Sequence, residues 1–347
     1  MSQFQVVPDG GGLPTAGGEV EPEAFEKAPA EKAIVGRSPR QLAWIRFRRD
    51  KAGVVSGCVV LFFVLIAVFA PLIAKLYGKD PYTHYGNKDP NLLNDYGFPM
   101  KPNGGMDGEY WFGVDPTLGR DVFTQLLYGI RTSLLIAVIV VLLVTAIGTV
   151  LGILAGYLGG KTDFIVSRAI DVLLAIPSQL FFIAFTPVAI ALMVDDSART
   201  ETPVVVQFMG VIVVLTIFGW CRIARVLRGQ VLSLREREFV EAAKVSGASS
   251  RRIVFRELLP NLWAPILIVA TVDVPTYVVT ESALSFLGVG VQEPTPDWGR
   301  MIRKGFDQLS TNPSYIMFPA IAMLLFVLAF NLLGDAVRDA LDPKSDR

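Results

Sequence analysis

The residues whose types could support catalysis are few. The 347-residue chain has one histidine, His84, and two cysteines, Cys58 and Cys221. The cysteines are far apart in the sequence and do not form the C-x-x-C pattern of metal and redox sites. A Ser-His or Cys-His pair would depend on His84, which lies in a polar stretch predicted to be a loop. The sequence therefore offers neither a nucleophile with a base nor a metal site, which argues against a membrane-embedded hydrolase.

One stretch is similar to a phosphate-binding loop. Residues 155–162 read A-G-Y-L-G-G-K-T, the looser form of the pattern. In a true phosphate loop the pattern lies between a strand and a helix, so that backbone N–H groups face the phosphates. Here it follows a long apolar segment. We interpret the glycines as the end of a membrane helix, with Lys161 at the cytoplasmic interface, and expect no cofactor on this chain.

Three acidic residues, Asp171, Asp273 and Glu281, lie in or at the ends of apolar segments. An ionised side chain at the centre of a membrane helix costs about 2.5 to 3.5 kcal/mol, so such residues suggest function. Asp171 is expected to pair with Arg168, three residues earlier. Asp273 and Glu281 either line a wet passage or hold a helix bundle together, and the sequence does not choose between these roles.

The elements that position these residues are predicted to be membrane helices. Hydrophobic residues make up 52% of the chain and charged residues only 18%, and the apolar residues form six blocks near or above the 20 residues that span a bilayer. The six predicted spans are 54–74, 132–157, 170–194, 203–222, 262–288 and 316–337. Prolines in the third and fifth predict kinks. We therefore predict an all-α, polytopic membrane protein.

The distribution of charge predicts how the chain is oriented. Of the 32 Lys and Arg residues, 22 fall in segments that are cytoplasmic if both termini are inside, as the positive-inside rule requires. Asp and Glu also total 32, so the net charge gives no reason to expect nucleic acid as a partner. The long segment from Lys75 to Arg131 is then external, and we expect it to form an irregular cap.

The predicted cytoplasmic segment from Arg222 to Pro260 is too long for a simple connection. Strong helix formers followed by Gly247 predict a short helix over 234–247. Its side chains at i, i+3, i+4 and i+7 are one aromatic and three small residues on one face, which a partner could approach closely. They are Phe239, Ala242, Ala243 and Ser246.

A second helix is expected after Gly247. Ser249 or Ser250 can cap its start, and Pro260 is expected to kink it toward the membrane. The alternative is a passive helix pair on anionic lipid, which the arginines of the segment would suit.

Several motifs of this chain occur together in a known family. Glu241-Ala242-Ala243, then Gly247, then Leu259-Pro260 resembles the signature loop of ABC importer permeases, which docks into ATPase subunits. The resemblance covers roughly residues 110–343, and together the motifs are similar to the C-type permease of dipeptide, oligopeptide and nickel importers. Further matching segments are 119–122, 127–129, 171–178, 233–237, 284–288, 294–299 and 331–335. Glu257, the polar insert at 195–202 and the long N-terminal tail depart from the family pattern.

The resemblance implies a type I importer bundle of six transmembrane helices with a cytoplasmic coupling helix. The residues that it assigns to the ATPase-coupling loop are Phe239, Glu241, Ala242, Ala243, Ser246, Gly247, Leu259 and Pro260. Glu is usual in the family at the position of Glu281, but Asp is not usual at that of Asp273.

The implied assembly sits in a bacterial inner membrane. Its other parts are a homologous second permease subunit, two ATPase subunits that bind ATP and Mg, and an external substrate-binding protein. The implied substrate is a peptide, with a nickel or other metal complex as the alternative. A self-contained ion-coupled transporter is less well supported because its halves should show internal repeats.

The expected domain limits follow from composition and resemblance. They are a disordered cytoplasmic tail at 1–36, an N-terminal segment with the first span and the external loop at 37–126, the permease domain at 127–338, and a cytoplasmic tail at 339–347.

Overall fold

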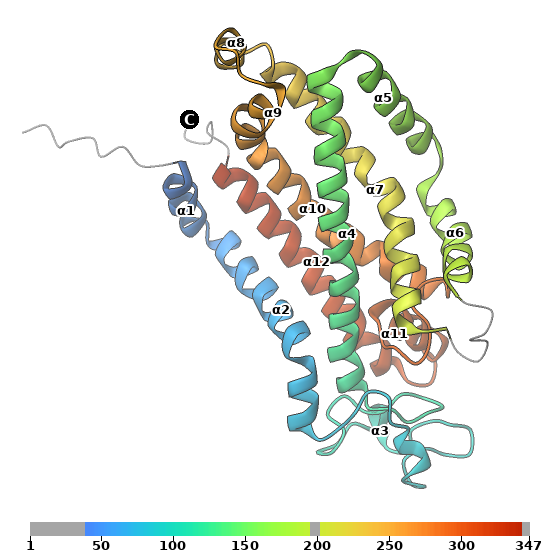
Figure 1. Ribbon diagram of the computed structural model, residues 1–347. Helices are drawn as coiled ribbons and strands as arrows, with labels where there is room; N and C mark the ends of the chain where they lie inside the picture. Colours follow the sequence, from blue (N-terminus) through green and yellow to red (C-terminus); the bar gives the residue numbers. More distant parts are fainter. Residues whose placement is uncertain (1–38, 195–201, 342–347) are drawn as a thin grey trace, which may run out of the picture. The chain divides into compact units, whose positions relative to one another are not determined.

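The computed structural model describes residues 39–194 and 202–341 (Figure 1). The predicted tail at 1–36, most of the insert at 195–202 and the last six residues of the chain lie outside these ranges. The regular elements of the described residues are helices, as predicted.

Within the described residues, five helices are long and apolar enough to cross a membrane. They are α2 (Lys51–Tyr77), α4 (Val122–Leu158), α7 (Val204–Leu234), α12 (Pro313–Leu341), and a 37-residue helix that comprises α9 (Ser250–Arg252), η2 (Ile253–Leu258) and α10 (Leu259–Phe286). The shorter helices are α1 (Pro39–Arg49), η1 (Tyr85–Asn87), α3 (Pro102–Gly105), α5 (Gly160–Ala175), α6 (Ser178–Met193), α8 (Glu238–Val245) and α11 (Trp298–Asp307).

The third predicted span is a broken pair of helices. α5 and α6 meet at an angle of 91° and count as a sixth span only if they are taken together. The break falls at Pro177, which has no N–H and disfavours α conformation in the residue before it; Ile176 accordingly has ψ 130°. The prediction of one helix over 170–194 is therefore corrected to two.

The second span starts ten residues earlier than predicted. Asp121 is the N-cap of α4, and its carboxylate accepts a hydrogen bond from the backbone N–H of Thr124 at 2.7 Å. The residues from Val122 to Arg131, expected to belong to the loop, thus form the first turns of the helix.

The most extensive helix contact among the described residues is between α4 and α7. Gly148, Gly152 and Gly156 follow one another at intervals of four residues and face α7. A Cβ atom at any of them would lie 2.7 to 2.9 Å from a main-chain oxygen of α7, and at Gly148 and Gly156 a side-chain atom would be closer still. Small residues at this spacing let helix backbones meet at van der Waals contact in membranes.

The other long helices pack around this pair. α2 contacts α4 and α12, while α10 contacts α4, α11 and α12. Phe63, Trp298 and Phe326 join α2, α11 and α12 in an aromatic cluster with ring centroids 5.5 to 6.2 Å apart. Many apolar side chains on the outer faces of α2, α4, α6 and α12 are exposed, as a lipid-facing surface requires.

The segment between α2 and α4 forms the predicted irregular cap, opposite the end that carries α8 (Figure 1). It is fixed by a network of ion pairs. Arg120 contacts Asp115 at 2.9 Å and Glu293 at 2.8 Å, and its side chain is 1% exposed. Arg300 and Lys304 of α11 also contact Glu293, at 3.1 and 2.6 Å. The network joins the cap to the segment between α10 and α11.

Candidate functional site

The predicted coupling helix is α8, and local interactions define its C-terminal end. The N–H of Gly247 donates to the carbonyl of Lys244 at 3.0 Å, and that of Ala248 to the carbonyl of Ala243 at 3.0 Å. These two bonds form a Schellman motif, whose C′ residue has positive φ. Gly247 has φ +76°, with open space around the position of a Cβ. The predicted glycine stop is thus confirmed.

α8 buries one side chain and exposes most of the others. Val240 is fully buried in the core of the bundle, and α8 contacts η2. The predicted partner face is only partly as expected. Phe239, Ala242 and Ser246 are exposed, together with Glu241 and Gly247, but Ala243 is half-buried against the core of its own chain.

The sequence analysis missed one residue of this surface. Val245, the last residue of α8, is 90% exposed. It lies three residues after Ala242, and this spacing is the signal that could have placed it beside the predicted face. An apolar side chain so far exposed on an eight-residue helix extends the surface that a partner could cover.

The second predicted helix begins as expected. Ser249 is the N-cap of α9 and accepts from the N–H of Arg252 at 3.4 Å. The helix then passes through η2, which is a π-helical segment, before α10. A π turn therefore lies just before Pro260, and the bend expected at that residue stays a prediction. A π turn shifts the hydrogen-bond register ahead of a proline that cannot donate.

Leu259 and Pro260 lie at the start of α10 and not on the exposed face of α8. Leu259 is half-buried against the same core as Ala243. Pro260 is exposed and lines a groove with Trp263 of α10 and Leu42 of α1. The predicted coupling residues therefore form one group on or next to α8 and a second group at the N-terminal end of α10.

The stretch resembling a phosphate loop lies between two helices. α4 ends at Leu158, Gly159 and Gly160 have φ +66° and +54°, and α5 begins at Gly160. Arg228 of α7 pairs with Asp163 in the first turn of α5, with one N–O distance of 2.8 Å. The glycines thus turn the chain from one helix to the next, as predicted.

Asp171 has a different partner from the one predicted. Its carboxylate contacts Arg225 of α7 at 2.9 Å, whereas Arg168 lies over the ring of Phe164. α5 packs against α7, so a residue on the neighbouring helix comes closer than one on the same helix.

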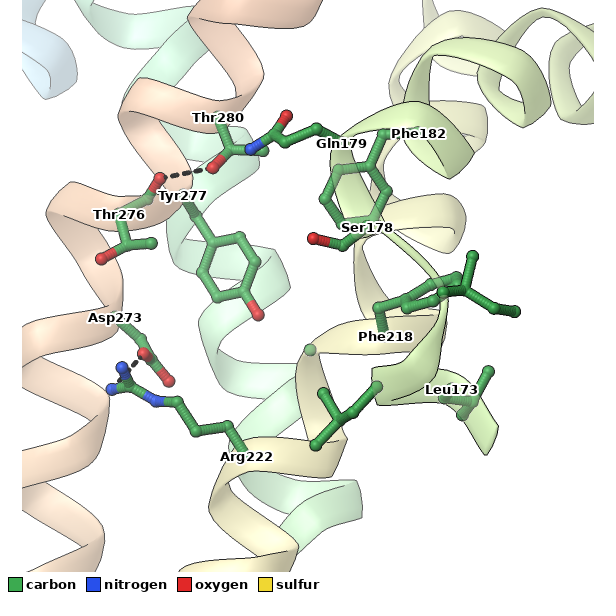
Figure 2. A pocket seen from close by; sticks show the side chains of 13 residues that line it. Leu173, Ser178, Gln179, Phe182, Phe218, Arg222, Asp273, Thr276, Tyr277 and Thr280 are labelled. Carbon is green, nitrogen blue, oxygen red and sulfur yellow. Dashed lines mark hydrogen bonds and ion pairs between the residues drawn. The ribbon is translucent and has the colours of Figure 1, made fainter. Parts of the chain in front are cut away.

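Asp273 lies in the wall of a cavity of about 250 Å³ between α5, α6, α7 and α10 (Figure 2). Its carboxylate contacts the guanidinium of Arg222, on α7, at 2.7 Å. Ser178 and Gln179 of α6 face Tyr277 and Thr280 of α10 across the cavity (Figure 2). Of the two roles left open for Asp273, the geometry favours lining a polar space.

Glu281 occupies a different environment. It is fully buried, and its carboxylate accepts from the hydroxyl groups of Ser285 at 3.1 Å and Ser282 at 3.4 Å. Asp297, the N-cap of α11, is a close electrostatic neighbour, and burial raises the pKa of Asp297. Both hydrogen bonds stay within α10 and the side chain is fully buried, so of the two roles left open for Glu281 the geometry favours one inside the bundle over lining a passage. In residues 39–194 and 202–341 no three His, Cys, Asp or Glu side chains are grouped so that they could hold a metal ion.

Comparisons with known proteins agree with this architecture. Residues 148–347 match the family described as binding-protein-dependent transport system inner membrane component, and residues 38–96 match the N-terminal TM domain of oligopeptide transport permease C. A methionine ABC transporter, MetNI, solved in inward facing conformations, has a chain with a TM-score of 0.50 and 19% identity. The match covers 63% of this chain and 97% of that one, and shows the fold alone.

Curated relatives align over almost their whole length. The dipeptide transport system permease protein DppC of Alkalihalophilus pseudofirmus is 37% identical, over 91% of this chain and 93% of the relative. The oligopeptide transport system permease protein OppC of Bacillus subtilis is 36% identical, over 93% and 96%. The glutathione transport system permease protein GsiD of Escherichia coli is 37% identical, over 92% and 96%. With these relatives and the bundle of long apolar helices, the chain belongs to the binding-protein-dependent transport inner membrane components, as a transmembrane permease subunit of an ABC importer.

Proposed function

We propose that the chain forms half of a membrane passage for short peptides and couples it to ATP hydrolysis on partner subunits. The observation that carries the proposal is the exposed face of α8, joined through η2 to the helix that carries Asp273. The names of the relatives support a peptide as the substrate.

The exposed residues of α8 are proposed to dock into an ATPase subunit. Small side chains at Ala242 and Ser246 allow close approach, while Phe239 and Val245 supply apolar area that association would bury. When the ATPases close on ATP, displacement of α8 would act on η2, which it contacts, and through η2 on α10. The free energy of ATP binding then shifts the conformation of the passage and breaks no bond in the substrate.

The full assembly would contain this chain, a homologous second permease subunit, two ATPase subunits and an external substrate-binding protein. The proposed orientation in a bacterial inner membrane places both termini and α8 in the cytoplasm. The excess of Lys and Arg in the segments on that side supports it. The cap with the Arg120 network would then face outward, toward the binding protein.

We propose that ATP and Mg bind only to the ATPase partners. The phosphate-loop pattern of this chain supports no nucleotide site, because Lys161 follows a turn between two helices. We expect the purified chain to bind no labelled ATP, and Lys161→Ala to leave nucleotide binding by the whole complex unchanged. Saturable binding by the isolated chain that is lost in Lys161→Ala would contradict this expectation.

The function is tested in two steps. Coexpression with the candidate partner genes should yield a complex in which two ATPase chains copurify with this chain. Proteoliposomes that contain the complex, supplied with binding protein outside and ATP inside, should then accumulate labelled di- or tripeptides. Accumulation of a nickel complex without any peptide would favour the alternative substrate, and uptake driven by an ion gradient without ATPases would contradict the proposal.

A further inference from the structure

We propose that the cavity bounded by Arg222 and Asp273 is a transient binding site for the charged ends of a zwitterionic peptide. The Arg222 guanidinium takes the carboxylate of the peptide, and the Asp273 carboxylate takes its ammonium group. This inference rests on the proposed function as a peptide permease and assigns residues of the passage to the substrate.

The ion pair is placed where charge is expensive. Asp273 is at the middle of α10 and its side chain is 6% exposed, while that of Arg222 on α7 is 53% exposed. An ion pair facing lipid hydrocarbon would carry a large desolvation cost, so the open side of the cavity faces water or protein. Arg222 thus keeps about half of its side chain open toward that side of the cavity.

The rest of the cavity wall suits the main chain of a peptide. Ser178 and Gln179 contribute a hydroxyl and an amide from α6 (Figure 2). The apolar side chains of Phe182 and Phe218 line the same space. The volume of about 250 Å³ lies below the roughly 300 to 1,000 Å³ of sites for drug-sized ligands, so the cavity suits a very short peptide or one end of a longer peptide.

Exchange of partners explains how such a site could be both selective and weak. Without peptide, Arg222 and Asp273 neutralise each other, so neither charge is left unpaired, which would be costly. A zwitterion that enters the cavity brings one charge of each sign, so each side chain loses one partner and gains another. The net change in free energy is then small, and a passage needs a site that releases its cargo as readily as it binds it.

One wall residue is held in place by close packing. The hydroxyl of Tyr277 lies against Gly219 of α7, where a Cβ atom would be 2.1 Å from it. Tyr277 reaches into the space between α7 and α10 beside Asp273 (Figure 2). Its ring fixes the depth of the cavity next to the acidic group.

The chain contains a matched control for the ion pair. Arg225 lies three residues after Arg222 on α7 and pairs with Asp171 at 2.9 Å. Its side chain is 54% exposed, close to the value for Arg222, but neither Arg225 nor Asp171 lines the cavity. A variant of Arg225 therefore removes the same charge from the same helix without altering the proposed site.

The test measures protection of a thiol in the cavity of the assembled importer. Ser178→Cys places the thiol in the cavity wall, and Asn91→Cys in the cap, where the side chain is exposed, supplies a reference thiol. Modification by a small thiol reagent is followed at both positions by mass spectrometry. Dialanine should slow the reaction at position 178 and not at position 91, and N-acetyl-dialanine amide should slow neither. For simple competition the rate falls about tenfold when the peptide is at about ten times its Kd.

Arg222→Gln and Asp273→Asn should each abolish this protection, whereas Arg225→Gln should keep it. Equal protection in Arg222→Gln, protection by the blocked peptide, or no protection in the otherwise unaltered chain would overturn the assignment. Peptide uptake by the same proteoliposomes separates the two proposals. Uptake without protection contradicts only this site, while absence of all peptide uptake contradicts the proposed function.

Discussion

The two ends of the bundle are held in different ways. The cap between α2 and α4 is fixed by buried ion pairs, in which Arg120 and Asp115 have side chains 1% and 0% exposed. α8, at the other end, has one buried side chain, Val240, among its eight residues. The charged groups of the cap thus find their partners within the same chain, whereas most side chains of α8 are left open for a partner protein to cover. Substitutions should therefore affect folding at the cap and assembly at α8.

The largest effect is expected at the cap. Arg120→Met leaves the buried carboxylate of Asp115 without its guanidinium partner, and loss of one member of a buried pair typically costs about 3 to 5 kcal/mol. The thermal midpoint of the purified complex should fall well below that of the unaltered protein. Lys101→Met, which removes a cation of the exposed pair with Asp107, is the control and should change it little. Equal losses would show that the cap is not held by the buried network.

The next effect is expected at α8, on assembly. Ala242→Trp adds a bulky side chain to the exposed face, and overpacking of a close interface costs about 1 to 3 kcal/mol. The ATPase subunits should then bind about 5- to 150-fold more weakly, while the unfolding of the isolated chain is unchanged. Ala243→Trp should impair both, because Ala243 also packs against its own core. Normal ATPase binding and uptake in Ala242→Trp would remove α8 from the interface.

A smaller effect is expected from the turn after α8. Gly247 has φ +76°, and a side chain in the left-handed region costs about 1 to 2 kcal/mol. Gly247→Val should therefore reduce hydrogen-exchange protection in α8 and lower peptide uptake. Gly229→Val is the matched control, because Gly229 also has open space around its Cβ position but no positive φ. Similar effects of the two variants would show that the conformation of Gly247 is not the cause.

The smallest effect concerns pH. Burial opposes ionisation of Glu293, but the hydrogen bond from Arg120 and the charges of Arg300 and Lys304 outweigh it and lower the pKa of Glu293 to about 2. A depressed pKa stabilises the folded state above the unfolded value of 4.5, and this contribution is lost as the pH falls from 4.5 toward 2. The thermal midpoint should be higher for the unaltered protein than for Glu293→Gln at pH 6, and the difference should shrink by pH 3.5. A constant difference would contradict this role.

Features set by local sequence were predictable. The end of α8 at Gly247 and the cap at Ser249 follow from hydrogen bonds between residues close in the chain. The start of α4 was also signalled, because Asp121 can accept from the N–H of Thr124, but the search for apolar residues placed the start after Arg131. At this end of α4, the N-cap residue determines where the helix begins, and the start of the apolar run does not.

Features set by packing between helices were not predictable. The Arg222–Asp273 pair joins residues 51 positions apart, and Arg120 and Glu293 are 173 apart. Sequence reasoning identified Asp273 as unusual because charge is costly in a membrane, but nothing local named Arg222 as its partner. The same limit explains why Asp171 was assigned to Arg168 rather than to Arg225.

The glycines of α4 have a mechanical consequence. Because Gly148, Gly152 and Gly156 bring the backbones of α4 and α7 into contact, sliding one helix along the other would drive the Cβ atoms of neighbouring residues into main-chain atoms. We therefore expect α4 and α7 to move together as one rigid body. If a partner displaces α8, the movement would be accommodated where helices contact each other less, at the break between α5 and α6 or between α7 and α10. Because Arg222 is on α7 and Asp273 is on α10, the distance between their side chains would change with such a movement and could be used to measure it.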